Sequence, residues 1–291
     1  MKPGSFEYRA ACSLDEAVDL LSEHGDDAKV IAGGQSLVPL MNLRLARPSL
    51  VVDLNPVLGL GTLRCNGEIT LGAMVRHREA ERSSDLLDAA PILCHALSHV
   101  GHPAIRSRGT IGGSVAHSDP AAELPTVLTA LDAVVVARST RGERTIASEK
   151  FFTGFLTTSL EDDEVVTEIR VSEPKTGWGW AFEEFSRRHG DFAVVGVAAL
   201  VAADVHNRIA DVRLVFSGVG ATPIRAHEAE AGLRGQDMSF ELFRDALAAA
   251  TRSLDPPDDL HGSSSYRRQL AGVLGEQALT AAWERSKGID R

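Results

Sequence analysis

The stretch Val30-Ile31-Ala32-Gly33-Gly34-Gln35-Ser36-Leu37 places a glycine pair directly after a short apolar run. A second pair lies in Thr110-Ile111-Gly112-Gly113-Ser114. Glycine permits positive φ, and it lets backbone N–H groups approach an anion closely. One such pair is usually a tight turn, and neither pair matches the G-x-G-x-x-G or P-loop pattern. Two pairs, each followed by serine, predict a site for the two phosphates of a dinucleotide cofactor.

The bulk composition bounds the class of protein. The chain has 291 residues, 44% of them hydrophobic and 24% charged, and a formal net charge of −10. These values suit a soluble protein of two or three units, and the acidic balance argues against a nucleic-acid partner. The longest apolar run, residues 193–203, has the length of a buried strand, so we expect no integral membrane segment.

The cysteines bound the redox chemistry. Cys12, Cys65 and Cys94 lie far apart, and no C-x-x-C pair occurs. The chain by itself is therefore not expected to hold an iron–sulfur cluster or a metal ion. The odd number of cysteines and the lack of a leader pattern lead us to expect a cytoplasmic protein.

Residues 1–57 are predicted to form a small helix-and-strand unit. After a lead with little strand character, Ser13 and Glu16 form a capping box for a helix, and Gly25 is placed to end it. Short strands are expected at 29–32 and 50–54.

Residues 58–175 are predicted to form a second unit, and a linker at 174–177 follows it. Its expected strands are 68–74, 133–137, 143–146 and 165–171, and its expected helices are 90–100 and 121–131. The remainder, 176–291, has a different pattern, with strands preceding helices. Three strands are expected at 181–185, 194–202 and 209–216, followed by helices at 226–233, 240–254 and 266–285. The overall fold class is therefore α+β. Gly218-Val219-Gly220 is interpreted as a turn.

Four motifs carry a resemblance to a known family. They are the segment 32–46 with Arg44-Leu45-Ala46, the segment 110–123 with His117-Ser118-Asp119-Pro120, the segment 182–193 with Arg187-Arg188-His189-Gly190-Asp191-Phe192-Ala193, and Ala221-Thr222-Pro223-Ile224-Arg225-Ala226. Together they resemble the FAD-binding medium subunit of molybdenum hydroxylases, the family of the carbon monoxide dehydrogenase and xanthine dehydrogenase flavin subunits. The resemblance covers essentially the whole chain.

The resemblance implies a two-subdomain FAD-binding domain of the vanillyl-alcohol-oxidase (PCMH) type and a carboxyl-terminal α+β domain with a three-stranded sheet. It implies non-covalently bound FAD, with no catalytic residue and no metal ligand on this chain. The implied cofactor-binding residues are Ala32, Gly33, Gly34, Gln35, Ser36, Leu37, Val100, Thr110, Ile111, Gly112, Gly113, Ser114, Ala116, His117, Asp119, Glu123, Leu160, Glu183 and Phe192.

Several of these residues have assigned places in the resemblance. His117 is expected near the flavin or its ribityl chain, Glu123 near the ribose of the adenine end, and Leu160 at the adenine. Purely structural roles for His117 and Glu123 remain open, since a first-turn acid also suits a helix dipole. Gln35 stands where many relatives have His, and Phe192 where many have Tyr. Phe192 keeps an aromatic ring that can stack but lacks the tyrosine hydroxyl, so the sequence does not decide the reduction potential of the flavin.

Four arginines near these motifs have two interpretations each. Arg106 and Arg108 precede the second glycine pair, and either add positive potential at the cofactor or are solvated loop residues. Arg187 and Arg188 either pair with Asp191 to fix the third motif or belong to a surface network.

The leading functional hypothesis is the flavoprotein subunit of a molybdenum hydroxylase complex. In it, a large subunit with the molybdenum cofactor and a small subunit with two [2Fe–2S] clusters would supply electrons that this chain passes to an external acceptor. A dimer of heterotrimers is the implied assembly. A stand-alone FAD-dependent oxidoreductase and an interaction subunit that has lost flavin are the alternatives. The sequence names neither the substrate nor the electron acceptor, because the substrate site would lie on another chain.

Overall fold

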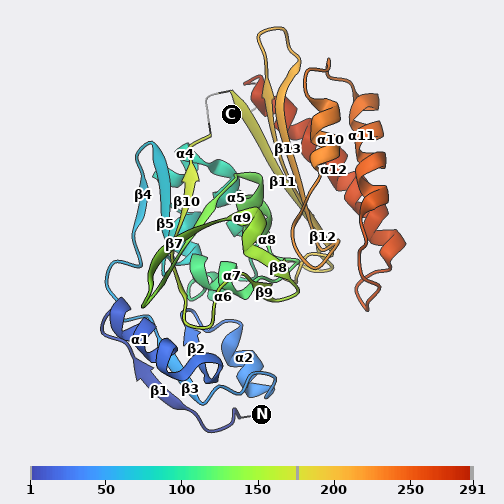
Figure 1. The fold of residues 1–291 in the computed structure, drawn as a ribbon. Coiled ribbons are helices and arrows are strands. Elements are labelled where there is room, and N and C mark those ends of the chain that lie inside the picture. Colours follow the sequence, from blue (N-terminus) through green and yellow to red (C-terminus); the bar gives the residue numbers. More distant parts are fainter. Residues whose placement is uncertain (1, 175–176, 289–291) are drawn as a thin grey trace.

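The computed structural model describes residues 2–174 and 177–288, and it contains three main sheets that follow one another along the chain (Figure 1). Each of the three predicted units holds one of these sheets. The unit boundaries near residues 57 and 175 remain predictions, and most of the expected linker lies outside the described residues. Among the described residues, no helix combines the length and apolar character needed to cross a membrane.

The first unit is a parallel three-stranded sheet in the order β1-β3-β2, flanked by α1. Its elements are β1 (Glu7–Ala10), α1 (Leu14–His24), a 3-10 turn (Gly25–Asp27), β2 (Ala28–Ile31), α2 (Leu37–Asn42) and β3 (Leu50–Asp53). The Ser13 hydroxyl accepts from the Glu16 N–H at 3.1 Å, as the capping box predicts, and Gly25 ends the helix at φ 51°. The expectation of a strand-poor lead was wrong. The four residues of β1 are all exposed at the sheet edge, so they lack an alternating pattern.

The second unit is an antiparallel five-stranded sheet in the order β4-β5-β10-β6-β7, covered by helices. Its strands are β4 (Leu63–Cys65), β5 (Glu68–Gly72), β6 (Val134–Ser139), β7 (Gly142–Ala147) and β10 (Val165–Ser172), with a separate pair β8 (Phe152–Gly154) and β9 (Thr157–Thr158). Its helices are α3 (His77–Glu81), α4 (Ser84–Ala89), α5 (Pro91–His99), α6 (Pro103–Arg106), α7 (Ile111–His117), α8 (Glu123–Ala130) and α9 (Ser148–Phe151). The predicted hairpin at 133–146 is confirmed as β6 and β7.

The carboxyl-terminal domain is an antiparallel sheet with three helices on its outer face (Figure 1). Its elements are β11 (Trp178–Phe185), β12 (Val195–Ala203), β13 (Ile209–Ser217), β14 (Ile224–Arg225), α10 (His227–Leu233), α11 (Phe240–Ser253) and α12 (Ser264–Ser286). The predicted three-stranded sheet is thus corrected to four strands. The two residues of β14 are too few to give a periodic signal. Gly218, interpreted as part of a turn, follows β13 at φ 72°.

The central strand of this sheet is buried on both faces. Ala198 and Leu200 of β12 join the core of the second unit, whereas Val197, Ala199 and Val201 pack under the outer helices. Burial on both faces explains the continuous apolar run that the sequence shows here. The carboxyl-terminal domain and the second unit therefore share one hydrophobic core.

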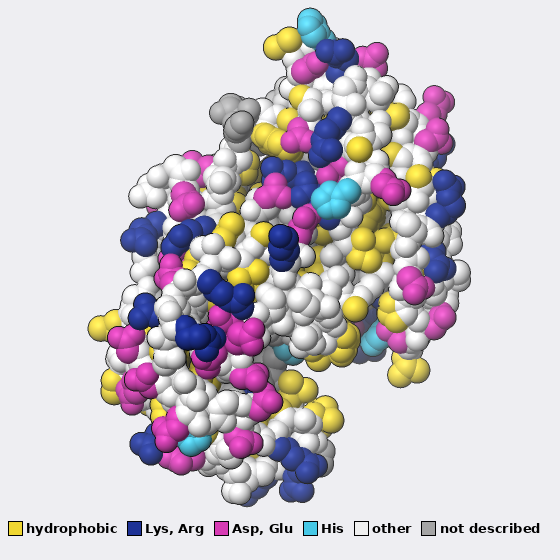
Figure 2. All heavy atoms as spheres, in the orientation of Figure 1, with side chains coloured by type: hydrophobic (Ala, Val, Ile, Leu, Met, Phe, Trp, Pro, Cys, Tyr) yellow, Lys and Arg dark blue, Asp and Glu magenta, His cyan; other side chains and the backbone are white. Residues whose placement is uncertain are grey.

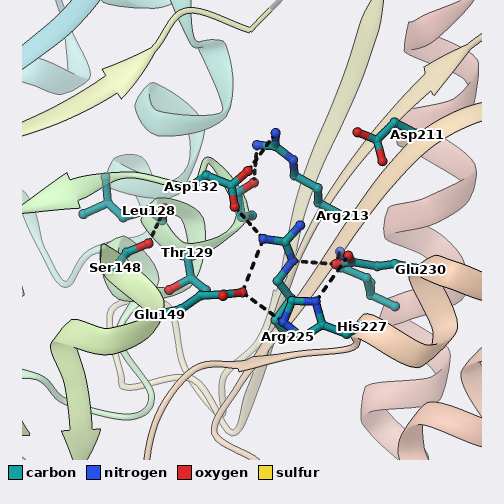
Figure 3. A network of polar contacts seen from close by, with 12 residues as sticks. Leu128, Thr129, Asp132, Ser148, Glu149, Asp211, Arg213, Arg225, His227 and Glu230 are labelled. Atoms are coloured by element: carbon teal, nitrogen blue, oxygen red, sulfur yellow. Dashed lines mark hydrogen bonds and ion pairs between the residues drawn. The ribbon is translucent and has the colours of Figure 1, made fainter. Parts of the chain in front are cut away.

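A polar network joins the same two parts at their edge (Figure 3). The Arg225 guanidinium contacts Asp132 at 2.5 Å and Glu149 at 3.3 Å in the second unit, and Glu230 at 2.9 Å in its own domain. The side chain of Glu230 is fully buried and also accepts the Leu214 N–H. Burial alone would lower the pKa of Arg225, but the Glu230 and Asp132 carboxylates outweigh it and raise that pKa. This network adds polar contacts between the two parts beside their shared core.

Candidate functional site

The first glycine segment is a loop of unused backbone donors between β2 and α2. Within the described chain, the N–H groups of residues 33–37 donate to no oxygen atom. These residues are only half-buried, and Gly34 has φ 70°. The Gln35 side chain folds back, with Nε2 donating to the Gly33 carbonyl at 3.0 Å. Consecutive free N–H groups in such a loop suit a phosphate group.

The second glycine segment is built differently. Thr110 caps α7, and its hydroxyl accepts from Gly113 N at 3.1 Å. Ile111 N donates to Val75 O, Gly112 N to Ala73 O, and Ser114 N to Thr110 O. The expectation that both glycine pairs offer free backbone donors is therefore wrong for the second pair. Its donors already serve the contact with residues 73–75, which follow β5, and the first turn of the helix.

Gly112 explains why glycine is needed there even without a free donor. A Cβ at Gly112 would lie 2.5 Å from the Ala73 Cβ, so this glycine lets α7 pack closely on the sheet. Gly113 and Ala116 are exposed on the other side of α7, and Ser114 is half-buried. The second segment thus presents the surface of a helix start, whereas the first presents its backbone.

The two segments meet although they belong to different units. A Cβ at Gly33 would lie 2.3 Å from the Arg108 carbonyl oxygen and 2.8 Å from the Gly109 Cα. A Cβ at Gly113 would lie 3.8 Å from the Ala32 Cβ. Glycine at position 33 therefore allows a backbone-to-backbone contact between the units, just before the Thr110 cap.

The carboxyl-terminal domain contacts the chain both before and after the second segment. A Cβ at Gly190, in the third motif, would lie 2.3 Å from His102 Cε1, and Gly218 N donates to the Pro120 carbonyl at 2.8 Å. The molecule is hollowed between its N-terminal part, at the bottom of Figure 2, and the part above it, and hydrophobic side chains gather at this notch. The first and third sequence motifs therefore both contact the stretch from His102 to Pro120, which contains most of the second motif.

A cluster of ionisable side chains is buried where α5 and α8 meet β11. His99 Nδ1 lies 3.2 Å from Glu184 Oε1, and this hydrogen bond raises the pKa of His99. Glu123 is 9% exposed. Burial, together with the nearby Glu184 carboxylate, raises the pKa of Glu123 from 4.5 to about 8. Glu184 Oε2 and Ser217 Oγ are buried without a hydrogen-bond partner in the described chain.

Stability should fall with rising pH because of Glu123. Its raised pKa means that the folded chain favours the protonated carboxyl, so this contribution is complete below pH 4.5 and is lost as pH rises through about 8. The free energy of unfolding of the wild type should fall by roughly a few kcal/mol between pH 4.5 and about 8, and Glu123→Gln should not show this fall. Denaturant unfolding of the FAD-free chain measures both. The exposed Glu79→Gln serves as control and should keep the wild-type pH profile. Parallel pH profiles for wild type and Glu123→Gln would contradict the assignment.

The remaining predicted residues lie in varied settings. Val100 and Leu160 are half-buried and pack against the core of the second unit. His117 ends α7 instead of leading a helix, and Asp119 accepts the Ala121 N–H at 2.9 Å. Phe192 is 72% exposed, so the described chain leaves this ring free to stack on a ligand. Glu183 is half-buried in β11.

The arginine expectations need correction. Arg106 is 8% exposed, pairs with Glu81 at 2.8 Å, and donates to the Val100 and Gly101 carbonyls. Arg106 therefore stabilises the segment before the second glycine pair. Because its charge is paired and buried, it neither adds an unpaired positive charge at the cofactor nor lies in solvent. Between the described side chains of Arg187, Arg188 and Asp191 there is no ion pair. The turn is held instead by Asp191 N donating to the Arg188 carbonyl at 3.0 Å.

Sequence reasoning missed several polar residues beside the glycine segments. His77 is buried with Nε2 2.8 Å from the Thr110 carbonyl oxygen, and burial lowers its pKa to about 4, so the ring is neutral and donates. Asn55 bonds to the Ala32 carbonyl at the start of the first segment, and Arg76 bonds to the Arg108 carbonyl two residues before the second. Each is a single polar residue outside any motif, so no signal in the sequence singles it out. Only the packing of the units reveals them.

Comparison with known proteins assigns the family. Residues 4–174 match the family described as FAD binding domain in molybdopterin dehydrogenase, and residues 180–282 match the CO dehydrogenase flavoprotein C-terminal domain. The chain belongs to this family of flavoproteins. FAD is accordingly its cofactor, and it is an oxidoreductase subunit of the medium-subunit type, as the sequence motifs predicted.

Individual relatives span the whole flavoprotein. It is 45% identical over 288 residues to the 6-hydroxypseudooxynicotine dehydrogenase complex subunit alpha of Paenarthrobacter nicotinovorans, covering 99% of this chain and 97% of that protein. It is 40% identical to the caffeine dehydrogenase subunit beta of Pseudomonas sp. (strain CBB1), covering 100% and 99%. The solved carbon monoxide dehydrogenase from Hydrogenophaga pseudoflava is similar at a TM-score of 0.95 and 37% identity, covering 98% of this chain and 99% of that chain.

The residues present fit FAD. The free N–H groups of residues 33–37 can donate to negatively charged oxygens, and a Cβ at Gly113 would lie 3.8 Å from the Ala32 Cβ at the start of the first segment. Buried polar atoms without a partner, Glu184 Oε2 and Ser217 Oγ, lie on the carboxyl-terminal sheet beside Gly196. These features suit a ligand that has both a phosphate part and a polar ring.

Proposed function

We propose that this flavoprotein carries electrons from an iron–sulfur partner subunit to an external acceptor within a molybdenum hydroxylase complex. FAD, when bound, supplies the capacity to take up and release electrons one or two at a time. The observation that carries the proposal is the loop 33–37, which has free N–H groups and packs beside the second glycine segment at the boundary between two units.

The chain's own residues would bind and orient this cofactor. We assign the pyrophosphate to residues 32–37 with the exposed side of Thr110 to Ser114. We assign the flavin end to the neighbourhood of His117, Glu183 and Phe192, and the ribose of the adenine end to the neighbourhood of Glu123. The hydroxyls and backbone N–H groups balance the phosphate charge without a lysine. Val100 and Leu160 offer apolar contacts for the adenine end. Glu123, protonated near neutral pH, is able to donate a hydrogen bond and adds no negative charge there.

The partners are inferred from the relatives. Several bear names of complex subunits, among them a nicotine 6-hydroxylase medium subunit and a carbon monoxide dehydrogenase medium chain. We propose a large subunit with the molybdenum cofactor, a small subunit with two [2Fe–2S] clusters, and a dimer of heterotrimers. The free cysteines Cys12, Cys65 and Cys94 are in keeping with a cytoplasmic setting. The relatives' names span alkaloids, carbon monoxide and glyceraldehyde, so the substrate is left to the large subunit.

The flavin-loaded chain alone should not oxidise an organic substrate. Adding N-heterocycles, aldehydes or carbon monoxide should leave the flavin absorbance unchanged, whereas dithionite should bleach it. The complex purified from its own cells should contain molybdenum and iron, and one substrate should bleach its flavin. Bleaching of the isolated chain by a substrate would favour the alternative, a stand-alone oxidoreductase, and a colourless complex would favour a subunit that has lost flavin.

A further inference from the structure

A short polar chain crosses from the first unit to the second directly beneath the two glycine segments. Asn55 follows β3, and its Nδ2 donates to the Ala32 carbonyl at 2.9 Å and to Asp53 Oδ1 at 2.5 Å. Both hydrogens of the amide group are thus used within the first unit. This orientation turns Oδ1 toward the second unit, where it accepts from Arg76 at 2.5 Å.

Arg76 completes the crossing with the other arm of its guanidinium. One terminal nitrogen donates to Asn55 Oδ1, and the other donates to the Arg108 carbonyl oxygen. That carbonyl is the same oxygen against which Gly33 packs. A planar guanidinium can span two acceptors at fixed angles, which the single ammonium group of lysine does not reproduce.

The backbone around Arg76 is itself tied to the second segment. Arg76 forms an isolated antiparallel bridge with Thr110, in which His77 N donates to the Gly109 carbonyl at 3.0 Å and Ile111 N to the Val75 carbonyl at 3.0 Å. The His77 ring then binds the Thr110 carbonyl. The side chain of Arg76 therefore extends from a fixed base toward the first unit.

The charge of Arg76 is not consumed by an ion pair. No carboxylate of the described chain lies within 4.0 Å of its guanidinium, in contrast to Arg106 and Arg225. Its two recorded acceptors are a neutral amide and a backbone carbonyl. A half-buried positive charge between two phosphate-facing segments also favours an anion there.

We propose that Asn55 and Arg76 form a positioning pair that sets the spacing between the two glycine segments and thereby determines how tightly FAD is held. The proposal rests on the assignment of residues 32–37 to the FAD pyrophosphate. Arg76 acts through the Arg108 carbonyl and Asn55 through the Ala32 carbonyl, so neither residue needs to touch the cofactor. The two bonds are solvent-exposed in the chain itself, so they contribute little to its global stability.

The test measures FAD affinity and unfolding on the same variants. Arg76→Met and Asn55→Ala should each weaken FAD binding about 10-fold, the size expected for one lost hydrogen bond to a charged group. Affinity is read by titrating the FAD-free full chain and following flavin fluorescence. The unfolding midpoint of the FAD-free chain should remain near that of the wild type. Arg78→Met, two residues along on α3, is the matched control for loss of a positive charge and should bind FAD normally.

Two further variants test whether Arg76 acts by its geometry and not only by its charge, and whether Asn55 and Arg76 act together. Arg76→Lys keeps the positive charge but not the planar guanidinium that spans two acceptors, so it should still bind FAD more weakly than wild type. The double variant should be no weaker than the weaker single variant, because both break the same bridge. The positioning role would be overturned if Arg76→Lys bound FAD as tightly as wild type, or if the losses of FAD affinity added up in the double variant. Should Arg76→Met unfold more readily, Asn55→Ala alone decides the outcome.

The inference and the proposed function fail in different ways. Gly33→Val tests the placement of the pyrophosphate on residues 32–37. It leaves both side chains of the pair in place, although it displaces the Arg108 carbonyl that accepts from Arg76. Full flavin content in Gly33→Val would refute the placement of the pyrophosphate, and the positioning role with it. Loss of flavin in Gly33→Val, with wild-type affinity in Arg76→Met and Asn55→Ala, would refute the positioning role alone.

Discussion

Replacing Gly33 with valine should leave the purified chain without its FAD. A Cβ at this position would lie 2.3 Å from the Arg108 carbonyl oxygen and 2.8 Å from the Gly109 Cα, which are backbone atoms of the neighbouring unit. The two units must separate to admit it, and overpacking of this kind costs about 1–3 kcal/mol or more, so FAD should bind about 100-fold more weakly. The flavin content of the purified chain, read from its absorbance spectrum, measures this directly.

The matched control is Gly61→Val, because nothing lies within 4 Å of a Cβ at that exposed glycine. It should keep its flavin. At Gly113 the nearest atom to a new Cβ is the Thr110 side-chain oxygen at 2.7 Å, and Ala32 follows at 3.8 Å. Gly113→Val should therefore also lose FAD, by disturbing the cap and filling the gap between the segments. A full flavin complement in either Gly33→Val or Gly113→Val would place that segment away from the cofactor.

Replacing Arg225 with methionine should give the largest loss of stability among the ion-pair variants. Glu230 would remain fully buried and lose the contact at 2.9 Å. Asp132 and Glu149 would each lose one of two contacts with the carboxyl-terminal domain, since Arg213 still pairs with Asp132 and His227 with Glu149. Breaking a buried pair from one side costs about 3–5 kcal/mol. Denaturant unfolding of the full chain should show a drop of about 3 kcal/mol, reduced from the upper figure because Arg234 still contacts Glu230 at 3.2 Å.

Arg208→Met is the control for this effect, since Arg208 pairs with Asp204 in an exposed turn. A surface pair of this kind contributes about 0–1 kcal/mol. Equal stability losses in Arg225→Met and Arg208→Met would show that the network in Figure 3 does not hold the two parts together.

The family and the order of elements could be predicted because their signals are local. The glycine pairs, the capping box at Ser13 and the apolar periods of α1 and β13 are each written in a few neighbouring residues. Elements such as β1 and β14 escaped prediction for the same reason, since an exposed edge strand and a two-residue strand carry no period. Arg225 stands in a motif that the sequence displays, yet its role as an interdomain contact does not follow from that motif.

The sequence by itself determined that this protein has an FAD-binding fold of the molybdenum hydroxylase type, with two glycine segments marked for the cofactor. Only the tertiary structure decided that the first segment offers free N–H groups and the second does not. Only it placed Gly33 against the Arg108 carbonyl, joined Asn55 to Arg76, and buried Glu123 beside Glu184. Hydrogen bonds between distant segments, and the desolvation that shifts a pKa, depend on which surfaces pack together, and no local pattern of residues encodes that.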